Sequence, residues 1–463
     1  MAEQHVIIGG GPAATNAIET IRQVDGGKSQ ITLISDEPAH SRMALPYWLA
    51  GQIPREHTMT ADDAYFAKLK VEARVGVRAQ KIDTKGKSVT LSDGKSVKFD
   101  NLLIATGSRP AELPVAGADL PGVGPLWTIE NTQCVLDAAK ENKKPRVLMI
   151  GSGFIGFIML NAMHKRGWQL TVVEMEKHVL PRMLDDQAAA IAETWLRGQG
   201  VDLHCGTTVK RITEKGKARV AELADGTSVE TDLVIIATGV KPNVELAVES
   251  GIDADQNGIS VNNRLQTSAP NVYAAGDVAV GPVLHSTERA VHAIQPTAVD
   301  HGRIAGSNMA GRQVDYPGSL SMNILDVCGL QNASFGDWSD TSAEAMTISN
   351  PGGYIYRNLL WNGDKLSGAV FVGRANDMGM LTDVGMVKGI MQTGTSFGSW
   401  KQFLQENPFD IRRPYVALKV AQKLTGATLL GTPSRTRGFQ YQNMKSGPAV
   451  KASHAVFMET SKG

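Results

Sequence analysis

Two glycine-rich segments of this chain have residue types and a spacing suited to binding the phosphates of a nucleotide. His5–Gly11 reads HVIIGGG and continues PAA, and Arg146–Gly153 reads RVLMIGSG and continues FIG. In each, an apolar run precedes glycines that open a helix, so that free backbone N–H groups and the helix dipole would face an anion. The small residues permit a tight turn, close approach of a pyrophosphate and close helix packing. The candidate binding residues are Gly9, Gly11, Pro12, Ala13 and Ala14 in the first segment, and Gly151, Gly153, Phe154, Ile155 and Gly156 in the second.

The two segments belong to a longer internal repeat. Leu91–Pro110 (LSDGKSVKFDNLLIATGSRP) matches Leu223–Pro242 (LADGTSVETDLVIIATGVKP), and both the Asp-Gly turn and the Ala-Thr-Gly triplet recur 132 residues apart. One glycine fingerprint is weak evidence, whereas two copies, each with its own turn and strand, predict two dinucleotide-binding modules. The triplets add further candidate binding residues, which are Ala105, Thr106, Gly107 and Gly239.

Acidic residues at the ends of the predicted second strands could select the nucleotide. Glu174 ends the run LTVVE, 23 residues after Gly151. A carboxylate there would accept hydrogen bonds from both ribose hydroxyls and repel a 2′-phosphate, which favours NAD over NADP. In the first module the matching acid is Asp36 or Glu37, and the sequence does not decide between them.

These modules must be positioned by a fold large enough to hold them, and we predict an α/β chain. A length of 463 residues suggests about three lobes. We expect two Rossmann-like dinucleotide-binding domains of the three-layer ββα type and a C-terminal α+β domain that forms a dimer. The predicted boundaries are 1–114 and 244–314 for the first domain, 115–243 for the second, 315–430 for the C-terminal domain and 431–463 for a basic tail.

Composition narrows the classes of function and of partner. The chain has 47 basic and 46 acidic residues, so nothing indicates binding to nucleic acid or to a membrane surface. No apolar run approaches the length of a membrane span, and the first strand begins within a few residues of the start, so we expect a cytoplasmic protein. The cysteines Cys134, Cys205 and Cys328 have no cluster-ligand spacing. We predict no metal site.

The combined motifs resemble a known superfamily. GxGxxA, a first Ala-Thr-Gly, GxGxxG, a second Ala-Thr-Gly and TSAPNVYAAGD at 267–277 are similar to those of the FAD- and NAD(P)-dependent pyridine nucleotide-disulfide oxidoreductases. Within that superfamily the chain most resembles the branch of nitrite reductases, NADH oxidases and rubredoxin reductases, over residues 3–430. The resemblance implies FAD on the first module, NAD on the second, a homodimer, and hydride transfer from NADH through the flavin.

The resemblance also implies particular flavin contacts. Gly276 and Asp277 of the third motif would lie at the FAD ribityl chain. A helix that begins near Ile294 would point its positive end at the pyrimidine edge of the flavin. Gln295 and Thr297 are the candidate ring contacts. The nearby His285, His292 and His301 are 7 and 9 residues apart, which is not ligand spacing on one helical face, and we expect them on a polar helix surface.

Three departures from the family pattern concern the chemistry. In Ser41–Gly51 (SRMALPYWLAG), Met43 stands where coenzyme A-disulfide reductases and NADH oxidases have a cysteine, and a thioether forms no thiolate, disulfide or sulfenic acid. Arg42 beside it is a candidate cofactor-binding residue. Ile158 replaces a glutamate near the nicotinamide, and Tyr47 replaces a lysine near the flavin. Joint loss of the pair avoids a buried unpaired charge, so Tyr47, Ile158 and Gln295 are our candidate residues at the hydride site.

Two classes of function follow. The first is an FAD-dependent oxidoreductase that takes hydride from NADH and passes electrons to an external acceptor or a partner redox protein, without a redox-active cysteine. The second is a flavin-binding subunit or redox-responsive binding protein with weak or no NADH turnover. The intact second fingerprint and Glu174 favour the first class, but the sequence does not identify the acceptor.

Overall fold

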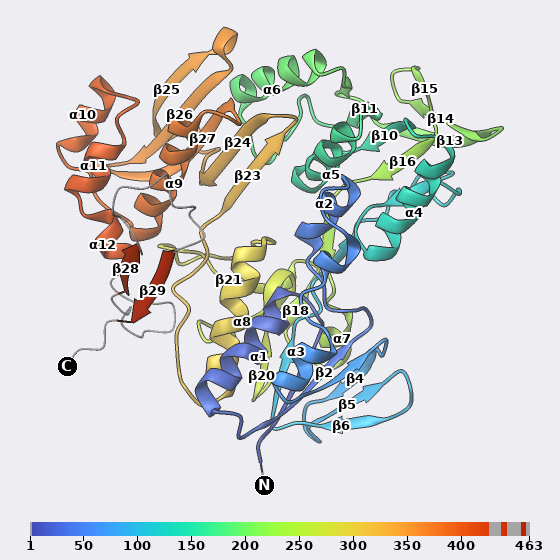
Figure 1. The fold of residues 1–463 in the computed structure, drawn as a ribbon, viewed down its shortest axis with the longest axis vertical. Helices are drawn as coiled ribbons and strands as arrows, with labels where there is room; N and C mark the ends of the chain where they lie inside the picture. Colours follow the sequence, from blue (N-terminus) through green and yellow to red (C-terminus); the bar gives the residue numbers. More distant parts are fainter. Residues whose placement is uncertain (1, 426–436, 442–454, 460–463) are drawn as a thin grey trace.

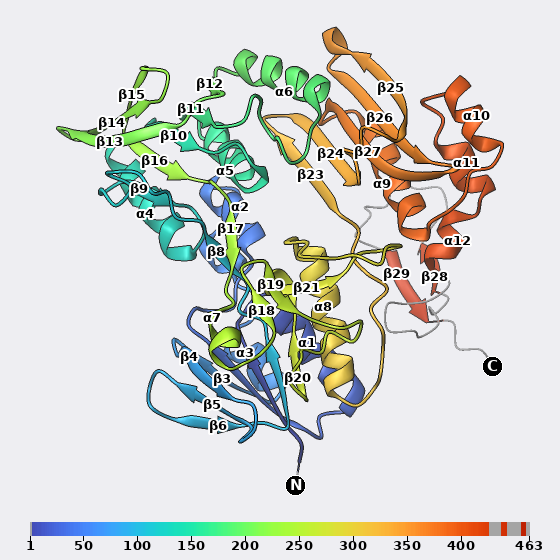
Figure 2. The same ribbon diagram turned by 180° about the vertical axis from the view of Figure 1, so that it is seen from behind.

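The computed structural model describes residues 2–425, 437–441 and 455–459. Figures 1 and 2 show three bodies: a first module beside the N-terminus, a second module built from the following residues, and a C-terminal domain. Most of the basic tail predicted for 431–463 lies outside the described residues. In the part of the chain that is described, no helix is long and apolar enough to cross a membrane.

The first module is a five-stranded parallel sheet in the order β20-β7-β1-β2-β3. Helices α1 and α8 pack against each other beside it, and a three-stranded antiparallel sheet shares its buried core, which gives the three-layer ββα arrangement. Its parallel strands are β1 (Gln4–Ile8), β2 (Gln30–Ser35), β3 (Val71–Val75), β7 (Asn101–Ile104) and β20 (Val272–Ala274). Its other main elements are α1 (Pro12–Asp25), β4 (Ala79–Asp83), β5 (Ser88–Leu91), β6 (Ser96–Lys98) and α8 (Gln295–Met309).

Short elements surround this sheet and join it to the second module. Strand β20 comes from far beyond the second module in the sequence, so the chain returns to complete the first sheet. The strands β8 (Ser108–Pro110) and β17 (Val240–Pro242) pair where the chain leaves and re-enters. The remaining short elements are η1 (Arg42–Ala44), α2 (Leu45–Leu49), η2 (Arg55–Thr58), α3 (Asp63–Lys68), α7 (Glu245–Glu249), β18 (Ala254–Asp255), β19 (Gly258–Ser260), η3 (Gly276–Val278), β21 (Ala279–Pro282) and β22 (Arg289–Ala290).

The second module repeats the plan of the first. Its parallel sheet has the order β12-β11-β10-β16-β9, and a three-stranded antiparallel sheet accompanies it. The parallel strands are β9 (Val123–Pro125), β10 (Arg146–Ile150), β11 (Gln169–Glu174), β12 (Asp202–Cys205) and β16 (Leu233–Ile236). The other elements are α4 (Ile129–Glu141), α5 (Phe154–Lys165), α6 (Asp186–Gly198), β13 (Val209–Lys215), β14 (Ala218–Leu223) and β15 (Ser228–Thr231).

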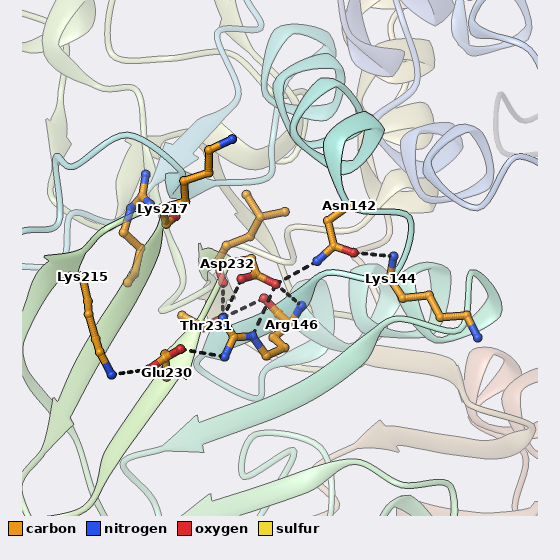
Figure 3. A network of polar contacts seen from close by, with 10 residues as sticks. Asn142, Lys144, Arg146, Lys215, Lys217, Glu230, Thr231 and Asp232 are labelled. Carbon is orange, nitrogen blue, oxygen red and sulfur yellow. Dashed lines mark hydrogen bonds and ion pairs between the residues drawn. The ribbon is translucent and has the colours of Figure 1, made fainter.

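The repeat extends to individual hydrogen bonds. Asp100 accepts the backbone N–H of Gln4 at 2.8 Å, and its counterpart Asp232 accepts that of Arg146 at 2.9 Å. In the second module this contact is part of a larger network, because the Arg146 guanidinium also forms ion pairs with Asp232 and Glu230 at 2.7 and 3.0 Å (Figure 3). The network lies at the start of β10, at the opposite end of the strand from the glycine turn.

The C-terminal domain is an antiparallel sheet with helices on one face. The order is β23-β24-β27-β26-β25. One face shares a buried cluster with the second module, and α9 covers the other. The strands are β23 (Met322–Val327), β24 (Leu330–Gly336), β25 (Glu344–Asn350), β26 (Ile355–Asn362) and β27 (Lys365–Arg374), followed by α9 (Met378–Thr393), α10 (Trp400–Glu406), α11 (Arg412–Ala417) and α12 (Val420–Thr425), with η4 (Pro351–Gly353) in between. Beyond them β28 (Arg437–Tyr441) pairs with β29 (Ala455–Glu459).

Candidate functional site

A cavity of about 1420 Å³ lies in front of the first glycine turn. It exceeds the roughly 300–1,000 Å³ typical of small-molecule sites, so it has room for an extended ligand. Its walls come from the first module, from helix α5 and the segment 127–130 of the second module, and from strand β23 of the C-terminal domain. The sequence-predicted residues that line it are Gly9, Gly11, Pro12, Ala13, Asp36, Glu37, Arg42, Ala105, Thr106, Gly107, Phe154, Ile155, Ile158, Gly276, Asp277 and Gln295.

The first glycine turn has the geometry that a pyrophosphate requires. Gly9 has φ +112°, and a Cβ there would overlap the carbonyl oxygen of Ala105. A Cβ at Gly11 would meet no atom within 4 Å, so the backbone is open on the cavity side. Pro12 begins α1, and Ala14 is fully buried beneath the turn rather than in the cavity. Free N–H groups at the start of α1 therefore face the space where an anion would lie.

In the first module, no acidic residue occupies the position that corresponds to Glu174 of the second module. The N–H of Gly9 donates to Ile34 and that of Gly151 to Val173, both at 2.8 Å, so the structural counterpart of Glu174 is Ser35. The expectation that Asp36 or Glu37 occupies the matching position is therefore wrong, because the acids follow one and two residues later. Both still line the cavity.

Asp277 lies in the cavity wall at the end of β20. Its carboxylate accepts a hydrogen bond from the Ser108 hydroxyl at 2.9 Å. Burial raises the pKa of Asp277, while the Ser108 hydroxyl and the Arg42 charge act in the opposite direction. An acceptor held at this point can receive hydrogen bonds from a polyol chain in the cavity.

A histidine supports the backbone beside Asp277. Gly276 has φ +79°, and its N–H donates to Nδ1 of His301 at 3.3 Å. His301 is only 1% exposed, so our expectation of a polar helix surface is wrong for this residue. Burial lowers the pKa of His301 to about 4, which keeps the ring neutral. No pattern in the sequence indicates that His301 is buried, because the inward face of α8 is set by its packing on α1.

Helix α8 points its N-terminus into the cavity. Gln295 is its first residue and lines the wall, and its side-chain oxygen accepts a bond from the Ser41 hydroxyl at 3.4 Å. Pro296 and Ala298 also line the cavity. Thr297 does not: its side chain is buried and only 4% exposed. The positive end of the helix dipole therefore faces this part of the cavity.

The wall around Ile158 is apolar. Met43 and Pro46 come from the first module, Ile158 from α5, and Met322 and Ile324 from β23. Tyr47 is 53% exposed and does not line the cavity. The structure thus differs from our expectation, since the short helix α2 turns Pro46 inward and Tyr47 outward.

The second glycine turn has the same backbone but a different setting. Gly151 has φ +98°, and a Cβ at Gly153 would meet nothing within 4 Å. A Cβ at Gly156 would lie 3.0 Å from that of Ala237, so helix and strand pack closely. None of these glycines lines the large cavity, and neither does Gly239, which is exposed with φ +117°.

Glu174 is held beside this second turn. One carboxylate oxygen accepts the N–H and the hydroxyl of Ser152 at 2.7 and 2.6 Å, and the other accepts the N–H of Glu176 at 2.9 Å. The residue is 7% exposed. Its position is therefore fixed by the turn that would bind the pyrophosphate.

No cysteine lines the cavity among the residues that the structure describes. Burial, with Glu193 nearby, raises the pKa of the Cys205 thiol to about 12. Burial likewise raises that of Cys328 to about 12. Both thiols are therefore poor nucleophiles at neutral pH.

Comparisons with known proteins give a consistent result. Residues 3–297 match the model of the pyridine nucleotide-disulphide oxidoreductase family. The NADH oxidase of Methanocaldococcus jannaschii is 31% identical over 333 residues, 70% of this chain and 74% of that protein. The ferredoxin–NAD(+) reductase subunit of the benzene 1,2-dioxygenase system of Pseudomonas putida is 29% identical over 380 residues, 81% of this chain and 88% of that protein.

A solved structure is similar over most of the chain. The NAD-dependent persulfide reductase from A. fulgidus superposes with a TM-score of 0.78 at 28% identity, and the match covers 86% of this chain and 78% of that one. With two other curated relatives, the match covers 46% and 48% of the relative's own length, so this chain spans about half of each.

Proposed function

Because this chain belongs to the pyridine nucleotide-disulphide oxidoreductase family, we propose that it oxidises NADH and passes the electrons to an acceptor outside the chain, without a thiol of its own. As a member of the family it is an NAD(P)H-dependent oxidoreductase with FAD and NAD(H) as cofactors. We propose below which residues bind each cofactor and which class of acceptor receives the electrons.

The first module would hold the FAD. The cavity has the volume for a dinucleotide, and its open backbone at Gly11 fits a pyrophosphate. Asp277 would accept hydrogen bonds from the ribityl chain, and the N-terminus of α8 at Gln295 would face the ring. Bound flavin would supply an acceptor for hydride and a donor of electrons.

The second module would bind the pyrophosphate of NADH at its own glycine turn, outside the cavity, and direct the nicotinamide towards the cavity wall. Gly153 leaves its backbone open to phosphate, and Glu174 lies beside the same turn, where a 2′-phosphate would be repelled. Ile158 and Met159 on α5 would then place the nicotinamide against an apolar wall. Packing rather than ion pairing would hold the ring there.

The absence of a thiol from the cavity is the observation that carries the proposal. Met43 lies in the wall, no described cysteine does, and the thiols of Cys205 and Cys328 have raised pKa values. Disulfide exchange or peroxide reduction of the thiol type needs an accessible thiolate. Electrons would therefore leave the flavin directly.

A redox protein is the acceptor that we propose. A relative that matches this chain over 81% of its length is named as a ferredoxin–NAD(+) reductase subunit. Such a partner needs no covalent intermediate on the reductase. A homodimer and a cytoplasmic location remain predictions of the sequence.

The test is reoxidation of NADH-reduced protein without oxygen. We expect rapid reoxidation by ferricyanide or a ferredoxin-type protein and slow reoxidation by a small disulfide. Replacing Cys134, Cys205 and Cys328 together by alanine should change these rates by less than about twofold, because none lines the cavity. A folded, flavin-loaded triple variant that no longer turns over would contradict the proposal.

A further inference from the structure

We propose that Trp127 and Arg42 form a closure over the flavin cavity, and that this closure makes retention of FAD depend on docking of the second module. The inference rests on the proposed binding of FAD in this cavity. Arg42 belongs to η1 of the first module, whereas Trp127 lies between β9 and α4 of the second. Both line the cavity.

Two contacts join the pair. The Arg42 guanidinium donates a hydrogen bond to the backbone oxygen of Trp127 at 2.8 Å. The same group lies 4.9 Å from the centre of the Trp127 ring, within the range of a cation–π interaction. Since an arginine can stack and donate at once, one side chain holds both the backbone and the ring of Trp127.

The pair is anchored at both ends to residues of the cavity wall. Glu37 forms an ion pair with Arg42, and about two thirds of the Arg42 side chain is covered. On the other side, the Trp127 indole N–H donates to the Ser108 backbone oxygen at 3.2 Å, and the Ser108 hydroxyl donates to Asp277 at 2.9 Å. A continuous series of contacts therefore runs from Glu37 to Asp277, and all five residues line the cavity.

The series crosses from one module to the other and back. Trp127 is its one member from the second module, so separating the modules would break the two contacts with Arg42 and the hydrogen bond to Ser108. A ligand beneath the closure leaves only after these contacts open. We therefore expect the closure to act mainly by lowering the rate at which FAD dissociates.

The experiment measures the rate at which FAD leaves the purified protein, with an excess of an apoflavoprotein specific for FAD to trap it. Trp127→Leu should raise this rate about 10-fold, because the stacking and the indole hydrogen bond are lost. Trp127→Phe keeps an aromatic face beneath Arg42 and should lie between the parent and Trp127→Leu. Trp338→Leu is the matched control, because Trp338 packs on the buried cluster shared by the second module and the C-terminal sheet and does not line the cavity.

A double variant tests the coupling between the two residues. In an Arg42→Met background, Trp127→Leu should raise the dissociation rate by less than about threefold, because its partner is already absent. Circular dichroism confirms folding of each variant, and Trp127→Phe with Arg42→Met serves as the pair if Trp127→Leu does not fold. The proposed closure would be overturned if Trp127→Leu raised the FAD dissociation rate by the same factor with Arg42 and with Arg42→Met. It would also be overturned if the dissociation rate of Trp127→Leu lay within twofold of the parent's. A parent that binds no FAD would instead overturn the proposed function.

Discussion

The two modules share a repeat but differ in what surrounds their glycine turns. The first turn opens into a cavity of about 1420 Å³ whose walls include α5 and β23, whereas the glycines of the second turn line no part of it. The backbone geometry is the same, since Gly9 and Gly151 have φ values of +112° and +98°. The shared fingerprint suits a dinucleotide pyrophosphate in both modules, and we propose that the elements around each turn decide how long the dinucleotide stays bound. A site with walls from all three bodies suits a resident cofactor, and an open turn suits a nucleotide that exchanges.

The modules also differ in their attachment to the C-terminal domain. The second module shares a large buried cluster with the C-terminal sheet, whereas the first module adds Leu45 and Leu49 of α2 to that cluster and has a separate core of its own. Asp185 caps α6 through the N–H of Ala188 at 3.0 Å and accepts the Tyr356 hydroxyl at 2.7 Å. The second module and the C-terminal sheet therefore form one block, against which the first module closes its cavity.

The largest effect should come from the first turn. Gly9→Ala forces an alanine to φ +112° and into the carbonyl of Ala105, so we expect a loss of more than about 3 kcal/mol of stability. Gly11→Ala is the matched control, because a Cβ there meets no protein atom. It should fold normally and bind FAD weakly. Thermal unfolding and the flavin-to-protein ratio check both, and a fully loaded Gly11→Ala protein would show that no phosphate lies there.

The equivalent change in the second module should separate the two sites. Gly153→Ala also meets no protein atom, so the protein should fold and keep its FAD. We expect the Kd for NADH to rise about 10-fold or more, because the new methyl group faces the pyrophosphate. Titration with NADH under anaerobic conditions measures it. Loss of FAD from this variant would mean that the two sites are not distinct.

Acid should affect the first module before the second. His5, His292 and His301 belong to the first module, and burial lowers the pKa of each, that of His301 to about 4. The unfolded chain takes up these protons near pH 6.5, so stability is present above that pH and is lost as the pH falls towards 4. For His301 the loss is on the order of 3 kcal/mol. Unfolding at a series of pH values, compared with His301→Gln, should show a shallower slope in the variant, and equal slopes would contradict this role.

A smaller effect than the loss of Gly9 or the protonation of His301 concerns nucleotide choice in the second module. Glu174→Gln should narrow the preference for NADH over NADPH by about 1–2 kcal/mol, because a neutral amide repels a 2′-phosphate less. The ratio of kcat/KM for the two nucleotides measures it. Asp36→Asn is the control, since Asp36 lies in the cavity of the first module. Equal use of both nucleotides by the unchanged protein would remove the basis of the assignment.

Local patterns in the sequence predicted the parts of the fold that depend on neighbours in the chain. Strand, glycine turn and helix follow one another within a few residues, so the α/β fold class with its Rossmann-like modules was predicted correctly, and a minority of the residues that line the cavity come from the predicted set. The rest depends on contacts between distant segments. The rotation of α2 exposes Tyr47, the packing of α8 on α1 buries His301, and the crossing segment brings Trp127 to Arg42. No periodicity or motif encodes these contacts.

We propose that NADH bound at the second module reduces flavin held by the first. Mixing the purified protein with NADH in the absence of oxygen, while following the visible absorbance of the flavin, tests it most directly. We predict rapid bleaching by NADH, slower bleaching by NADPH, and bleaching in Gly153→Ala only at higher NADH concentration. A flavin-loaded protein that NADH does not bleach would show that no hydride passes from NADH at the second module to the flavin.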